Sequence, residues 1–190
     1  MKNANLRVIT LGLLAATVFP SAMSGQQPSQ KACDLLTPAE LGSVIGGNAG
    51  HASGKEIPYH KNPQLGIEHE GVLYECVQSV GARKATVRYS TSGGAAESKK
   101  KAEAVAKDAQ KVMENLGYQV QFNDVGGSHC TTLLPFAGAK GNELIPVGTT
   151  CVLEKGEYFV SIQVSGTNDV LPAEKVATLA EKAAARLPSR

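Results

Sequence analysis

The sequence contains no tryptophan, few aromatic residues and little net charge. Aromatic residues make up 5% of the 190 residues, and 19 Lys and Arg against 17 Asp and Glu leave a formal net charge of +2. Nucleic-acid-binding proteins combine a strongly basic surface with aromatic side chains that stack on bases, and this chain has little of either. The same charge is too weak to draw the molecule onto an anionic membrane. We therefore expect no nucleic acid among its partners.

Sequence motifs of catalysis are also missing. The chain has no Gly-x-Ser-x-Gly nucleophile elbow, no His-Glu-x-x-His zinc motif and no dinucleotide-binding glycine fingerprint. No pair of carboxylates stands out as a general acid and base. The sequence therefore implies no cofactor and favours a function without catalysis.

No apolar run reaches membrane-spanning length. The apolar segment over residues 8–19 is much shorter than the roughly 20 residues that a spanning helix needs. It follows the basic residues Lys2 and Arg7 and is closed by Pro20 and a stretch of small residues. This order is typical of a secretory signal peptide, so we predict a signal peptide over residues 1–24.

The rest of the chain predicts a single exported domain. Residues 25–31 have no periodic apolar pattern and predict a flexible tether, and residues 32–190 have a length that one hydrophobic core usually serves. A lipid anchor requires a cysteine directly after the signal peptide, whereas the first cysteine here is Cys33. We therefore expect a periplasmic or secreted protein without a stable membrane anchor after cleavage.

All cysteines of the chain lie in the predicted mature part. They are Cys33, Cys76, Cys130 and Cys151. An even number in an exported protein indicates two structural disulfides, for which three pairings are open. Zinc binding is disfavoured because no Cys-x-x-Cys pair occurs. His129 precedes Cys130 but does not supply it with a base, since neighbours on an extended chain point to opposite faces.

Hydrophobic patterning predicts an α+β fold built on antiparallel hairpins. Four segments alternate apolar and polar residues and predict two hairpins: 72–80 with 85–91, and 149–154 with 158–165. Helical periodicity predicts two main helices over residues 95–116 and 172–187, and Thr37 caps a shorter helix that begins at Pro38. We expect an antiparallel sheet from the two hairpins and extra strands, packed by the two main helices.

Residues 48–71 break this patterning and predict a long loop. Glycine, proline and histidine are frequent in it, and the candidate metal ligands His51, His60 and His69 follow one another at even spacing. A metal or proton-linked site is conceivable there. The spacing matches neither a helical His-x-x-x-His nor a His-x-His pair, so solvated loop histidines are the favoured interpretation.

The two predicted halves of the domain, residues 32–124 and 125–190, share the order cysteine, hairpin, helix. A shift of 75 residues aligns Cys76 with Cys151 without a gap. An internal duplication explains this order, but shared periodicity explains it equally well. If the duplication holds, it selects disulfides Cys33–Cys76 and Cys130–Cys151.

One short run carries a family resemblance. Residues 33–41 read Cys-Asp-Leu-Leu-Thr-Pro-Ala-Glu-Leu and precede a cysteine in the first hairpin, a helix, and a second cysteine-hairpin-helix unit that ends near Ala-Arg-Leu. This arrangement resembles a family of small exported actinobacterial proteins of unknown function, which are similar to the extracellular sensor domain of a mycobacterial receptor kinase. The resemblance implies an antiparallel sheet with helices, two disulfides and a cleft. Many members are lipoproteins, whereas the lipid-attachment cysteine is absent here.

Together, these features favour an exported, non-enzymatic binding or sensor-like domain. Its partner would be a small ligand or an envelope protein, held in a cleft between the two halves. Two alternatives stay open. A cell-envelope hydrolase or metal-dependent enzyme would use the histidines of residues 48–71, and a structural or assembly protein of the envelope would pair through sheet edges.

Overall fold

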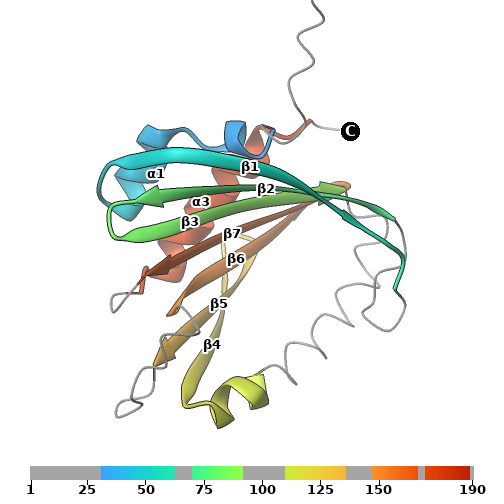
Figure 1. Ribbon diagram of the computed structural model, residues 1–190. Coiled ribbons are helices and arrows are strands. Elements are labelled where there is room, and N and C mark those ends of the chain that lie inside the picture. Colours follow the sequence, from blue (N-terminus) through green and yellow to red (C-terminus); the bar gives the residue numbers. More distant parts are fainter. Residues whose placement is uncertain (1–30, 63–69, 92–109, 136–146, 167–169, 189–190) are drawn as a thin grey trace, which may run out of the picture.

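A computed structural model describes residues 31–62, 70–91, 110–135, 147–166 and 170–188 (Figure 1). These residues form one sheet of seven strands: β1 (Ala49–Tyr59), β2 (Gly71–Val80), β3 (Arg83–Thr91), β4 (Tyr118–Val125), β5 (Ser128–Pro135), β6 (Val147–Lys155) and β7 (Tyr158–Gly166). The helical elements are η2 (Cys33–Leu35), α1 (Pro38–Ile45) and α3 (Ala173–Ala185). The predicted α+β class with an antiparallel sheet is confirmed.

Two antiparallel meanders make up the sheet, and they meet at its centre. The strand order is β1-β2-β3-β7-β6-β5-β4, so only the β3–β7 pair joins strands from different meanders. At this junction Val87 lies opposite Ile162. The predicted hairpins are the β2–β3 and β6–β7 pairs, and β1, β4 and β5 are the extra strands. The meanders divide the chain between β3 and β4, earlier than the expected boundary between residues 124 and 125.

Glycines occupy the first loop position of both predicted hairpins. Gly81 and Gly156 have φ angles of 58° and 59°. A positive φ at this position lets a two-residue loop follow the right-handed twist of its strands, and side chains with a Cβ rarely adopt it. Glycine therefore closes both turns where the sequence predicts them.

The expected loop over residues 48–71 is wrong for most of its length, because Ala49–Tyr59 form strand β1. β1 pairs with β2 almost throughout, for example Gly54 with Cys76, and a register irregularity falls between Ala49 and Ala52. Strand β1 lies at the edge of the sheet, where a strand needs little apolar patterning and tolerates a proline such as Pro58. Residues 63–69 lie outside the described part of the chain.

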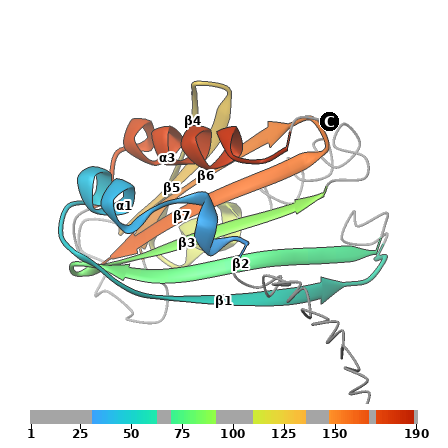
Figure 2. The same ribbon diagram turned by 90° about the horizontal axis from the view of Figure 1, so that it is seen from above.

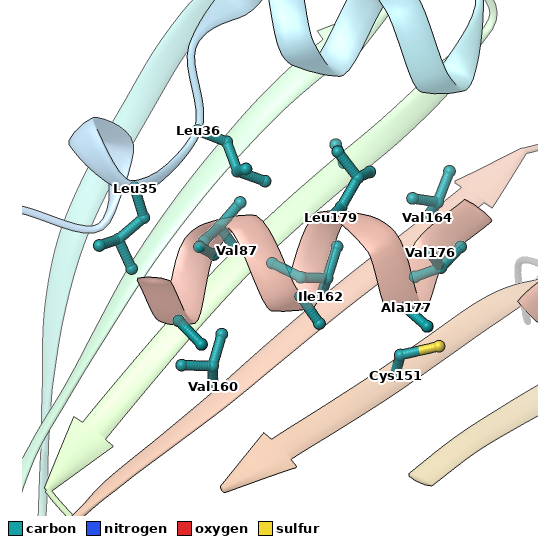
Figure 3. Packing of buried hydrophobic residues seen from close by; sticks show 14 of the residues in the cluster. Leu35, Leu36, Val87, Cys151, Val160, Ile162, Val164, Val176, Ala177 and Leu179 are labelled. Carbon is teal, nitrogen blue, oxygen red and sulfur yellow. The ribbon is translucent and has the colours of Figure 1, made fainter. Parts of the chain in front are cut away.

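Helices α1 and α3 cover the same face of the sheet (Figure 2). α3 packs over β5, β6 and β7, and α1 packs beside it against β1 and β2. The predicted apolar stripe of α3 is buried: Val176, Leu179, Ala180, Ala183 and Leu187. Figure 3 shows Val176 and Leu179 of this stripe beside Val160, Ile162 and Val164 of β7, which the alternating pattern also predicts to face inward. Burying one such aliphatic side chain contributes about 1.5–3 kcal/mol.

The other predicted main helix, over residues 95–116, falls mostly outside the described ranges. Of its residues, 110–116 are described, and 110–115 are helical. The helices that the described residues form are too short or too polar to span a bilayer.

One disulfide links the helical layer to the sheet, and the other lies within the sheet. Cys33–Cys76 ties η2 to β2, and Cys130–Cys151 joins directly opposite residues of β5 and β6. This pairing is the one that the duplication hypothesis selects. Two unrelated hairpins are compatible with the same pairing, so it does not establish a duplication.

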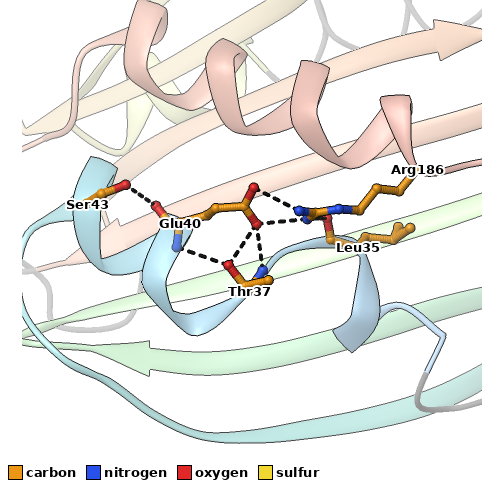
Figure 4. A network of polar contacts seen from close by, with 5 residues as sticks. All are labelled: Leu35, Thr37, Glu40, Ser43 and Arg186. Atoms are coloured by element: carbon orange, nitrogen blue, oxygen red, sulfur yellow. Dashed lines mark hydrogen bonds and ion pairs between the residues drawn. The ribbon is translucent and has the colours of Figure 1, made fainter.

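Arg186 joins the C-terminal end of the domain to its N-terminal end (Figure 4). Its guanidinium donates to the two carboxylate oxygens of Glu40 at 2.8 and 2.9 Å and to the carbonyl oxygen of Leu35 at 2.6 Å. Glu40 also completes the predicted capping box with Thr37 at the start of α1. The hydrogen bond from Arg186, followed by those from Thr37, lowers the pKa of Glu40 from 4.5 to about 2.

Candidate functional site

The face of the sheet opposite α1 and α3 is polar along its central strands, and we call it the polar face. Side chains alternate between the two faces along a strand, and residues in register share a face. The strand pairing therefore determines which side chains lie on the polar face. The residues on the polar face of β2, β3 and β7 are Glu75, Val77, Ser79, Lys84, Thr86, Arg88, Ser161, Gln163 and Ser165. An antiparallel sheet that packs one face on the core commonly presents polar side chains on the other, as these strands do.

A depression of about 520 Å³ lies on the polar face, where β2, β3 and β7 run side by side (Figure 1). Its volume is within the range of about 300–1,000 Å³ that is usual for small-molecule sites. The depression crosses the β3–β7 pair, which is the junction of the two meanders.

A chain of polar contacts, here called the polar ladder, crosses the depression from β1 to β7. Glu75 accepts hydrogen bonds from Lys55 Nζ at 2.9 Å and from Arg88 Nε at 2.5 Å. Arg88 Nη1 donates to Gln163 Oε1 at 3.3 Å. The ladder thus fixes the orientation of the Arg88 guanidinium from two sides.

Glu75 is ionised although it is buried. Only 5% of the residue is exposed, and burial by itself raises the pKa of a carboxyl group. Burial is the largest single effect on the pKa of Glu75, but the hydrogen bonds and charges of Lys55 and Arg88 together outweigh it and lower that pKa. The depression therefore holds a fixed negative charge between two cations.

Lys84 adds a further cation at the depression. Its side chain is exposed, and it forms no ion pair with another described residue. Thr86 and Ser165, which are both buried, bring hydroxyl groups beside it. The arrangement provides cationic and hydrogen-bonding groups of the kind that bind polar ligands.

The two histidine candidates that lie in described residues, His51 and His60, are far apart along the chain. His51 lies within β1 and His60 directly follows that strand. Nine residues of extended chain separate them by roughly 30 Å, so they do not share one metal ion. His69 lies outside the described residues. The described ranges contain no cluster of three or more His, Cys, Asp or Glu residues that is arranged to hold a metal.

His129 has a partner that the sequence did not reveal. Its Nδ1 lies 2.6 Å from Asp124 Oδ1 across the β4–β5 pair, and both side chains are largely exposed. The neighbouring Cys130 is bound in a disulfide. A thiol–imidazole pair is therefore not available at this position.

Sequence reasoning missed Glu75, Arg88 and Gln163 as site residues. A signal was present, because Arg88 lies on the polar side of a predicted strand that turned out to be central in the sheet. The pairing of β3 with β7, which brings Arg88 next to Gln163, is not encoded in local patterning.

The chain matches no protein-family model and no curated protein sequence. Among solved structures, the extracellular domain of PknH from Mycobacterium tuberculosis has a similar fold, with a TM-score of 0.52. The two share 11% sequence identity over 83% of this chain and 95% of that domain. This confirms, at the level of the fold, the expected similarity to the extracellular domain of a mycobacterial kinase.

Proposed function

We propose that this chain is an exported, non-enzymatic, sensor-like domain that binds a ligand in the depression over β2, β3 and β7. The observation that carries the proposal is the polar ladder of Lys55, Glu75, Arg88 and Gln163, which runs from the edge strand β1 to the central strand β7. Replacing a buried ion pair by apolar residues is often neutral or stabilising, so stability alone gives little reason to keep one here. A half-buried, oriented guanidinium beside a depression is in contrast well suited to recognition.

The position of the depression supports a cleft between two halves of the domain. Its walls come from β2 and β3 of the first meander and from β7 of the second. A ligand there contacts both meanders, so its binding strengthens their junction. A sensor domain needs such a coupling between ligand and fold.

Two features support export. Both disulfides are of the kind that persists in an oxidising compartment, and residues 1–24 have the order of a signal peptide. The proposal places the domain outside the cytoplasm, in the periplasm or the medium, with residues 25–31 as a tether. The fold of a bacterial extracellular domain is in keeping with this location.

The proposal is tested by nuclear magnetic resonance with ¹⁵N-labelled protein and a fragment set that mixes neutral, cationic and anionic molecules. Bound fragments should shift the amide resonances of residues 75–88 and 163–166. Ser79→Trp places a large side chain in the depression and should abolish these shifts. Gln121→Trp, at an exposed position of the edge strand β4, is the matched control and should preserve them.

Two results would contradict the proposal. One is a fragment set whose shifts map elsewhere or are absent. The other is an equal response of the Ser79→Trp and Gln121→Trp variants to the same fragments. Thermal denaturation of both variants confirms that they are folded before titration.

A further inference from the structure

Positive charge exceeds negative charge at the depression. Glu75 is the one acid among the described residues that line it, and both Lys55 and Arg88 bind its carboxylate. Two cations on one carboxylate leave a surplus of one positive charge. Lys84 and Arg83, which also line the depression, add to it, so the local potential attracts an anion even though the whole chain is nearly neutral.

Arg88 is oriented in a way that leaves part of its guanidinium for a ligand. Its Nε and Nη1 donate to Glu75 and Gln163, whereas Nη2 donates to no other described residue. About a third of the side chain, 32%, is exposed. A guanidinium fixed in this way suits a carboxylate or a phosphate, because its planar donors match two oxygens and lose little entropy on binding.

Hydrogen-bonding side chains lie between the two cations. Lys84, Thr86 and Arg88 follow one another on the polar face of β3, with roughly 7 Å between successive side chains. Thr86 lies opposite Gln163 and Lys84 lies opposite Ser165. Hydroxyl and amide groups both donate and accept hydrogen bonds, which is the chemistry that recognises ligand hydroxyls.

From this arrangement we infer that the depression takes a small hydroxylated oxyanion, such as an acidic sugar or a sugar phosphate. Its carboxylate or phosphate binds the free side of the Arg88 guanidinium. Its hydroxyl groups contact Thr86, Gln163 and Ser165, and Lys84 raises the affinity through its charge. The inference rests on the proposed function, since it names the ligand class of that same depression.

The experiment titrates the full chain with five probes and follows the amide resonances of residues 84–88 and 163–165. Glucuronate and glucose 6-phosphate should bind saturably, and their relative affinities distinguish a carboxylate from a phosphate ligand. Inorganic phosphate should bind more weakly, because it lacks the hydroxyl pattern. Glucose and glucosamine should bind at least about tenfold more weakly than glucuronate, because they lack the negative charge.

Three variants separate a binding role from a structural one. Lys84→Glu reverses an exposed charge and should lower the affinity for the anionic probes by about tenfold. Lys175→Glu makes the same charge change on α3, which covers the opposite face, and should leave the affinities unchanged. Arg88→Lys keeps the charge that faces Glu75 but removes the planar fork, so it should lower the affinity for both anions.

The ligand class is overturned if glucose binds as tightly as glucose 6-phosphate, or if Lys84→Glu and Lys175→Glu have equal effects. It is also overturned if fragments of another class shift the amide resonances at the depression while both anionic sugars leave them unchanged. In these cases shifts at residues 75–88 and 163–166 still support a binding site in the depression. Absence of all such shifts, with every probe and fragment, overturns the proposed function as well.

Discussion

Glu75 and Arg88 lie opposite each other on β2 and β3, with 2.5 Å between Glu75 Oε2 and Arg88 Nε. The pair lies on the second and third strands of the sheet, and its side chains are 6% and 32% exposed. Lys55 and Gln163 extend the contact to both neighbouring strands. The same ion pair therefore belongs to the fold and to the proposed ligand site.

The first prediction concerns this pair. Glu75→Gln removes the carboxylate and leaves Lys55 and Arg88 without their counter-charge, so unfolding in urea should need about 1–3 kcal/mol less free energy. The double variant Glu75→Leu/Arg88→Met replaces the pair by apolar side chains and should recover much of this loss. A double variant that is as unstable as the sum of its single variants would contradict the coupling between the two residues.

The second prediction concerns acid stability. The pKa of Glu40 falls to about 2 in the folded protein, so the unfolded chain binds a proton at higher pH than the folded one. The stabilisation by Glu40 is complete above pH 4.5 and is lost as the pH falls towards 2. Because the Arg186 and Glu40 side chains are 38% and 22% exposed, solvent screening limits this effect to on the order of 1 kcal/mol.

Arg186→Gln tests this effect, with Lys182→Gln on the exposed side of α3 as the control. Urea unfolding measured from pH 6 to pH 2 should show a flatter decline for Arg186→Gln than for wild type and the control. Glu75 contributes its own acid sensitivity equally to all three proteins, so the difference between the curves is the relevant quantity. Parallel curves would refute the assignment of the effect to the Glu40–Arg186 contact.

The third prediction compares the two disulfides. Each restrains the unfolded chain, by about 3–4 kcal/mol in the chain-entropy model. Cys33–Cys76 closes a separation of 43 residues and Cys130–Cys151 one of 21. Replacing both cysteines of the first bridge by alanine should therefore cost about 0.6 kcal/mol more than replacing those of the second. Peptide mapping without reductant checks the pairing directly, and any crossed link would contradict the structure.

The fourth prediction contrasts two leucines. Leu179 on α3 is fully buried, whereas Leu116 is 54% exposed. Leu179→Ala should lower the free energy of unfolding by about 2–5 kcal/mol, because it leaves a cavity under the helix. Leu116→Ala should change it by less than about 0.5 kcal/mol. Similar losses for both variants would mean that α3 does not cover the core as described.

The sequence predicted the parts of the fold that are determined locally. Thr37 and Glu40 form a capping box because their spacing brings side chain and backbone together within one helical turn. Val176, Leu179 and Ala183 repeat at the helical period and all face the core. The hairpins closed by Gly81 and Gly156 follow from short-range turn chemistry.

Features that depend on non-local pairing were not predictable from the same patterns. β1 has few apolar residues because it is an edge strand, so its pairing with β2 overrides its weak strand signal. Glu75 appears as an ordinary polar residue of a strand until β1 and β3 bring Lys55 and Arg88 to it. The depression likewise exists only because β3 pairs with β7, across a long stretch of intervening chain.

A crystal structure of the chain with the tightest-binding fragment is the most direct test of ligand binding in the depression. We expect electron density over Thr86 and Gln163, with an oxyanion of the fragment within hydrogen-bonding distance of Arg88 Nη2. Density for the fragment away from β2, β3 and β7, with the depression occupied by water alone, would contradict this expectation.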